Sequence, residues 1–143
     1  RNKMLGFIFQ QYNLLPKLTV LENVELPLLY AGLSDAEQEK RALASLDRVG
    51  LKSKAKNHPA QLSGGQQQRT SIARALINNP SLVLADEPTG NLDSKSSEEV
   101  MSMLKMCNQN YGQTVIMITH NLDIAKQADR IITISDGKIV EEA

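Results

Sequence analysis

Residues 62–69 read Leu62-Ser63-Gly64-Gly65-Gln66-Gln67-Gln68-Arg69, and residues 82–88 read Leu82-Val83-Leu84-Ala85-Asp86-Glu87-Pro88. In the first stretch a serine and two glycines precede an amphipathic segment. The serine can cap a helix, the glycines let backbone N–H groups approach a ligand, and the helix dipole favours negative charge at that end. The second stretch predicts an apolar strand that ends in two adjacent acids. The pair therefore predicts an anion-binding helix start followed by a strand with carboxylates at its end.

In this order, the two stretches resemble the signature motif and the magnesium-binding strand of ATPases of the ATP-binding cassette (ABC) class. The resemblance implies an α/β fold of the P-loop NTPase kind, with a layered parallel sheet and a helical subdomain. The phosphate-binding sequence Gly-x-x-x-x-Gly-Lys-Ser/Thr does not occur in the chain. In the family, that loop lies N-terminal to both stretches. We therefore expect an N-terminally truncated nucleotide-binding domain that is inactive as an ATPase by itself.

Composition narrows the class of protein. Sixteen acidic residues balance sixteen basic ones, so no bulk charge directs the chain to nucleic acid or to an anionic membrane. The single cysteine, Cys107, excludes an internal disulfide and fits a reducing compartment. It shares a helical face with Val100, Met103 and Leu104, which favours core packing over a reactive thiol. No apolar segment approaches the ~18–20 residues that span a bilayer, so we expect a soluble, cytoplasmic domain.

The first half of the chain predicts a strand and then a helical lobe. Residues 5–9 form a short apolar segment that is typical of a buried strand. The lobe is expected over about 12–80. It holds a helix at 20–29, shortened or kinked by Pro27, and a second helix that begins after Ser34 and ends at Val49. The signature then begins a helix that runs to about Asn78.

The second half, about 81–143, predicts an α/β core. The strand 82–85 is followed by a helix that Asp93 or Ser94 caps and that runs to about Asn110. The strand 114–119 is apolar throughout, as a parallel strand covered on both faces should be. A short helix capped by Asn121 follows, and Asp136-Gly137 predicts a terminal hairpin. This alternation of strands and helices predicts a layered sheet.

Polar side chains follow three of the predicted strands: Gln10 the first, Asp86 and Glu87 the second, and His120 the third. Ligands bind outside the carboxyl ends of the strands in open parallel sheets, so the four groups should face one crevice, which suits magnesium and a triphosphate. Asp86 is the natural Mg²⁺ partner, through water, because this ion prefers carboxylate oxygen. Glu87 could polarise the attacking water, His120 could donate to the γ-phosphate, and Gln10 could bridge metal and water. Each alone could be an ordinary turn or loop residue; their joint occurrence favours a site.

The family resemblance extends over essentially the whole chain. Phe9-Gln10 resembles the glutamine loop, Gly90-Asn91-Leu92-Asp93 the D-loop and Thr119-His120 the switch histidine. His58, the other histidine, is predicted to lie on the surface. Residues 10–24, 61–69 and 84–94 are similar to the macrolide-exporter and lipoprotein-releasing group of ABC ATPases.

The resemblance also implies cofactors and partners: ATP, Mg²⁺, a second copy of the domain and transmembrane permease subunits. Such domains pair head to tail, and each ATP lies between one subunit's phosphate loop and the other's signature. The resemblance therefore implies that four signature residues contact the nucleotide of the partner subunit: Ser63, Gly64, Gly65 and Gln66. It also implies that the D-loop, which includes Asp93, extends across the dimer interface. Closure would drive a permease docked near residues 10–23, which implies a location on the inner face of the membrane.

Two other interpretations are open. An ABC protein linked to nucleic acid should show basic patches or long coiled-coil insertions, and the chain shows neither. A non-catalytic interaction module is a fair description of the 143 residues without a phosphate loop, whereas the intact Glu87 and His120 argue against it for a parent protein. The transported substrate cannot be read from this sequence, because the membrane subunits select it.

Overall fold

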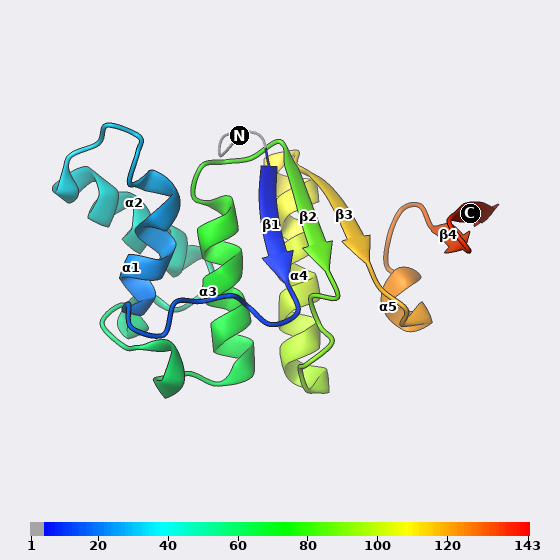
Figure 1. Ribbon diagram of the computed structural model, residues 1–143, viewed down its shortest axis with the longest axis horizontal. Helices are drawn as coiled ribbons and strands as arrows, with labels where there is room; N and C mark the ends of the chain where they lie inside the picture. The colour runs from blue at the N-terminus through cyan, green and yellow to red at the C-terminus, as the bar shows by residue number, and fades with distance from the viewer. Residues whose placement is uncertain (1–4) are drawn as a thin grey trace.

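The central sheet of the protein has three parallel strands, as the computed structural model of residues 5–143 shows (Figure 1). They are β1 (Leu5–Phe9), β2 (Leu82–Asp86) and β3 (Thr114–Ile118), in the order β1-β2-β3. Phe9 pairs with Asp86, and Asp86 with Ile118. The three strands therefore end at one edge of the sheet, and the predicted α/β class is confirmed.

The helical lobe lies between β1 and β2 in sequence. It comprises α1 (Val20–Glu25), α2 (Asp35–Arg48), α3 (Gly64–Leu76) and the short 3₁₀ turns η1 (Leu26–Leu28), η2 (Lys52–Lys54) and η3 (Pro59–Gln61). The predicted caps form, because the side chains of Thr19 and Ser34 accept hydrogen bonds from the backbone N–H groups of Glu22 and Glu37. Pro27 lies within η1, so the first helix ends earlier than the predicted position 29.

Helix α3 joins this lobe to the sheet, since it packs against β1 as well as α1 and α2. The Ser45 hydroxyl donates to the backbone oxygen of Ala73 at 2.8 Å, which ties α2 to α3. A Cβ atom at Gly6 would lie only 2.8 Å from the Ala75 oxygen. The close approach of α3 to β1 therefore requires glycine at position 6.

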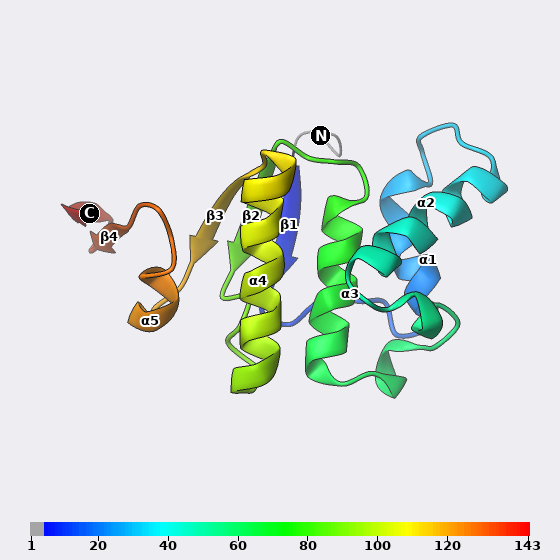
Figure 2. The ribbon, with the colours of Figure 1, turned by 180° about the vertical axis from the view of Figure 1, so that it is seen from behind.

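The remaining elements follow the predicted order. Helix α4 (Ser94–Tyr111) covers the same side of the sheet as α3 (Figure 2), and Gly112 ends it in a left-handed conformation with φ of 64°. Helix α5 (Leu122–Ala125) leads to the hairpin of β4 (Ile132–Ser135) and β5 (Lys138–Glu142), which stands away from the three-stranded sheet. No helix within residues 5–143 has the length and hydrophobicity that crossing a membrane requires.

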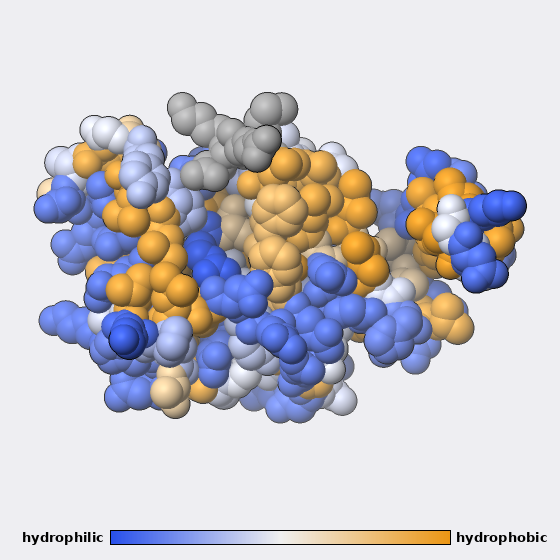
Figure 3. Space-filling view, viewed as in Figure 1, coloured by the Kyte–Doolittle hydropathy of each residue, from blue (hydrophilic) through white to orange (hydrophobic). Residues whose placement is uncertain are grey.

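The core lies on one side of the sheet. Ile8, Val83 and Ala85 are buried and contribute to the cluster formed by the helices. On the opposite face Phe7, Ile116 and Ile118 are 46%, 51% and 61% exposed, and an apolar surface faces the viewer there (Figure 3). The prediction that strand 114–119 is covered on both faces is wrong, because the described helices pack on one face alone.

Candidate functional site

Glu87 and His120 meet at the carboxyl edge of the sheet. The Glu87 Oε1 atom lies 2.5 Å from His120 Nδ1 and accepts a hydrogen bond of 3.1 Å from the His120 backbone N–H. The Glu87 side chain is 19% exposed and that of His120 89%. Two of the three predicted strand ends are thus joined directly.

The backbone at Glu87 is unusual. Its φ is +45°, in the left-handed region that non-glycine residues seldom adopt. The Glu87 N–H donates to the oxygen of Ile118 at 2.9 Å, and the Gly90 N–H donates to the oxygen of Glu87. These bonds and the His120 contact hold the carboxylate in a fixed position, as is common for strained residues at functional sites.

Asp86 is the last residue of β2 and is exposed. Among residues 5–143 no three His, Cys, Asp or Glu side chains form a cluster that could hold a metal ion. The donor set nevertheless fits Mg²⁺ bound with a nucleotide, because this ion is usually held by one or two carboxylates while water and phosphate oxygens supply the other ligands. Asp86 is the carboxylate that would hold it.

Gln10 pairs with the D-loop. Its Nε2 donates to Asn91 Oδ1 at 3.3 Å, and Asn91 Nδ2 donates to the Gln10 backbone oxygen at 3.2 Å. A Cβ atom at Gly90 would lie 2.5 Å from Gln10 Nε2, so glycine leaves the space that this side chain occupies. The Gln10 Oε1 atom is not used in the pair, which leaves it as an acceptor for a metal or a water.

Ser63 caps α3 in a complete capping box. Its hydroxyl accepts from the Gln66 N–H at 3.2 Å, and the Gln66 side chain accepts from the Ser63 N–H at 3.0 Å. Gly65 is buried where α3 approaches α4, and a Cβ atom there would lie 2.5 Å from Ser96 Oγ. In the described part of the chain, no hydrogen bond joins Ser63 to Asp86, Glu87 or His120. The signature and the strand-end residues are therefore two separate groups within one chain.

Asp93 is the N-cap of α4. Its carboxylate accepts from the Ser96 N–H at 2.8 Å, and this hydrogen bond is the main reason why the pKa of Asp93 lies below its usual range. The alternative, a cap at Ser94, is wrong, because Ser94 is the first helical residue.

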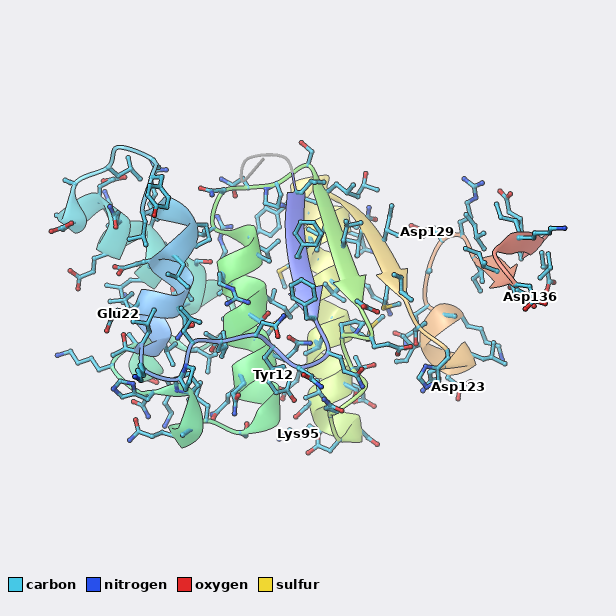
Figure 4. The ribbon with its side chains drawn as sticks, in the orientation of Figure 1. Tyr12, Glu22, Lys95, Asp123, Asp129 and Asp136 are labelled. Atoms are coloured by element: carbon cyan, nitrogen blue, oxygen red, sulfur yellow. The ribbon has the colours of Figure 1, made fainter. Side chains whose placement is uncertain are left out.

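Gln68 and Arg74, both on α3, were not predicted as site residues, yet Gln68 contacts the last residue of β1 and Arg74 contacts the loop that follows it. Gln68 Nε2 donates to the oxygens of Phe9 and Pro88, and Arg74 donates to the oxygens of Tyr12 and Asn13 at 2.9 and 2.8 Å. Figure 4 shows Tyr12 where that loop crosses α3. Burial lowers the pKa of Arg74. A sequence signal did exist for Gln68, because it shares a helical face with Ile72 and Leu76.

The fold is that of an ATP-binding cassette. A post-hydrolysis dimer of the cassette MJ0796 bound to ADP and Pi superposes with a TM-score of 0.88 at 49% identity, over 100% of this chain and 63% of that one. The ABC transporter family matches residues 1–90. The chain therefore belongs to the ABC transporter family.

Two curated relatives support this family assignment. The uncharacterized ABC transporter ATP-binding protein YvrO of Bacillus subtilis (strain 168) is 51% identical over 98% of this chain. The macrolide export ATP-binding/permease protein MacB of Pasteurella multocida (strain Pm70) is 54% identical over 96% of it. The chain spans 61% of the length of the former and 21% of the latter. The expected similarity to the macrolide-exporter group is confirmed.

Proposed function

We propose that this chain is part of the ATP-hydrolysing subunit of a membrane exporter, with Mg²⁺-ATP as the substrate. The observation that carries the proposal is the Glu87–His120 pair at the common end of β2 and β3, next to the exposed Asp86. A carboxylate held by a histidine beside a second carboxylate suits the activation of water near a metal-bound phosphate.

In this proposal each group has one task. Glu87 polarises the attacking water, and its contact with His120 fixes the direction of the carboxylate. His120 is highly exposed beyond that contact, so its ring can also reach a γ-phosphate. Asp86 would hold Mg²⁺ together with Gln10, and the ion would supply charge neutralisation on the phosphates.

The signature residues Ser63, Gly64, Gly65 and Gln66 serve the nucleotide of a second copy of the domain, with Asp93 and its D-loop at the dimer contact. Their separation from the Glu87–His120 pair supports this assignment. The dimeric state of the similar cassette MJ0796 supports a homodimer. A permease partner, and hence a position on the cytoplasmic side of the membrane, is suggested by the relative MacB, whose name combines ATP-binding and permease functions. We also propose the division into a lobe at about 12–80 and a core at about 81–143.

The substitution Glu87→Gln tests the proposal in the full-length protein. It keeps the size of the side chain but removes the base, so turnover should fall by about 10²–10⁴-fold. ATP-bound dimers should accumulate, because closure no longer ends in hydrolysis. Steady-state phosphate release and sedimentation with ATP measure the two effects, and Glu98→Gln, an exposed acid on α4, is the control. A near-parental rate in Glu87→Gln would show that Glu87 is not the base.

We expect the 143-residue polypeptide itself to bind Mg²⁺-ATP weakly and not to hydrolyse it. Its sequence has no Gly-x-x-x-x-Gly-Lys-Ser/Thr loop to hold the β- and γ-phosphates. Calorimetric titration with Mg²⁺-ATP measures the affinity. Micromolar binding by the monomer would contradict this expectation and would require a different nucleotide site.

A further inference from the structure

Gln68 is a polar side chain in the interior of the protein. It is fully buried on α3, where Ile72 and Leu76 follow it on the same face. Its Nε2 atom donates to the Phe9 oxygen at 3.0 Å and to the Pro88 oxygen at 2.7 Å. One carboxamide thus bridges the last residue of β1 and the loop after β2, which are far apart in the sequence.

The orientation of this carboxamide follows from its neighbours. Both nearby atoms are carbonyl oxygens, which only accept, so the NH₂ group must face them. The Oε1 atom is then buried without a hydrogen-bond partner among the described residues. A buried acceptor without a partner is unfavourable, but an apolar side chain here would remove both hydrogen bonds and leave the buried Pro88 oxygen without a donor. Gln68 therefore contributes to stability, and a test has to separate that contribution from an effect on hydrolysis.

The two carbonyl groups lie next to the proposed catalytic residues. Phe9 immediately precedes Gln10, and Pro88 immediately follows Glu87. Gln68 thus holds the end of β1 and the exit of β2 at a fixed separation. It lies on the helix that Ser63 caps, so this side chain links the signature helix both to the end of β1 and to the loop after β2.

A second contact makes this link testable. Arg74 independently ties α3 to Tyr12 and Asn13, further along the loop after β1. The loop therefore stays attached to α3 when Gln68 is replaced, and the lost bonds act on the positions of Gln10 and Glu87.

We propose that Gln68 is a positioning residue for ATP hydrolysis, which sets the relative placement of Gln10 and Glu87 and couples both to the signature helix. The inference rests on the proposed function. Gln68 itself touches neither nucleotide nor metal in this proposal.

The test compares Gln68→Met with Gln67→Met in the full-length protein. Gln68→Met keeps the length of the side chain and removes both donors, whereas Gln67 donates only to Leu62, just before its own helix. We expect kcat to fall by about 10–100-fold in Gln68→Met, as for a small misplacement of reacting groups. The KM for ATP should stay near the parental value, and Gln67→Met should hydrolyse ATP normally. The melting temperature of Gln68→Met should fall because the buried Pro88 oxygen loses its donor, so kcat is compared at a temperature at which all the proteins are folded.

A second variant, Gln68→Glu, guards against a simple packing effect. A protonated glutamic acid retains one O–H donor, whereas the carboxylate has none. Its kcat relative to the parent should therefore recover as pH falls, and Gln68→Met should show no such recovery.

The outcomes separate the two claims. Absence of hydrolysis in the parent would overturn the proposed function and this inference with it. A hydrolysing parent with parental kcat in Gln68→Met would overturn this inference alone. A lowered melting temperature at unchanged kcat, or loss of the folded protein in both variants, would assign Gln68 a purely structural role and would also overturn it.

Discussion

Gly65 is a point of close approach between the signature helix and α4. A Cβ atom at this position would lie 2.5 Å from Ser96 Oγ and 2.9 Å from Ser96 Cβ. Non-bonded heavy atoms prefer separations of roughly 3.5–4.0 Å, so Gly65→Ala creates an overlap of about 1 Å. Rotation of the serine hydroxyl cannot remove the clash with Ser96 Cβ. The two helix starts must therefore move apart.

Two effects of opposite sign determine the change in stability. Overpacking of this kind costs about 1–3 kcal/mol. Against it, replacing glycine with alanine stabilises by about 0.4–1 kcal/mol, because the unfolded chain has fewer conformations to lose. The clash should dominate, and Gly65→Ala should lower the free energy of unfolding by about 1–2 kcal/mol. For a domain of this size, that is a fall of about 3–8 °C in melting temperature.

A double-mutant cycle with Ser96→Gly isolates the clash. Once both side-chain atoms of Ser96 are removed, the nearest remaining atom is Ser96 Cα at 3.9 Å, an ordinary contact. In the Ser96→Gly background, Gly65→Ala should therefore be neutral or slightly stabilising. Urea unfolding followed by circular dichroism measures all four proteins. Ser97→Gly is the matched control, because it costs similar helix propensity but leaves Ser96 in place. Additive effects of Gly65→Ala and Ser96→Gly would refute the reasoning.

Two further predictions concern exposure. The thiol of Cys107 is buried and its pKa is raised, chiefly by that burial. Because only the thiolate reacts readily, alkylation by iodoacetamide should be slow at neutral pH in the folded protein and fast in urea; equal rates would contradict the burial. The exposed apolar side chains Phe7, Ile116 and Ile118 share one face of the sheet, so the 143-residue polypeptide should associate as its concentration rises. Sedimentation velocity measures this, with Phe7→Lys as the variant in which association should weaken, and a strictly monomeric polypeptide at high concentration would contradict it.

Local sequence rules were sufficient for most helix starts. Thr19, Ser34, Ser63 and Asn121 each cap the helix that the sequence assigns to them. Capping depends on a side-chain oxygen and on N–H groups two or three residues further along, so the information is local. The ends of helices were less accurate: the signature helix was expected to reach about Asn78 and ends at Leu76.

The convergence of strand ends was also predictable, because it needs only the direction of the strands. Parallel strands with polar residues after their last positions must present those residues at one edge. The rule accounts for the position of Asp86, Glu87 and His120 at one edge of the sheet. The rule does not say which polar groups touch, and Gln10 bonds to Asn91 instead of joining the Glu87–His120 pair.

Gln68 shows what the sequence could not provide. Its helical face predicts burial, and burial of a glutamine predicts partners, but the partners are backbone oxygens 59 and 20 residues away in the sequence. Backbone acceptors carry no sequence signature, because every residue has one. A link of this kind becomes visible only once the loops after β1 and β2 are placed in space.

The error at β3 has a different cause. An apolar strand without alternation is typical of a sheet covered on both faces, and the residues of β3 have that composition. Within residues 5–143 the helices cover one face, so Ile116 and Ile118 are left at the surface together with Phe7 of β1. The hydrophobic pattern thus indicates the environment for which a strand is suited, whereas the observed burial depends on which helices of the described residues pack against that strand. Where the two disagree, as on this face of the sheet, apolar side chains gather into one exposed surface, and that surface is the physical reason for the predicted association.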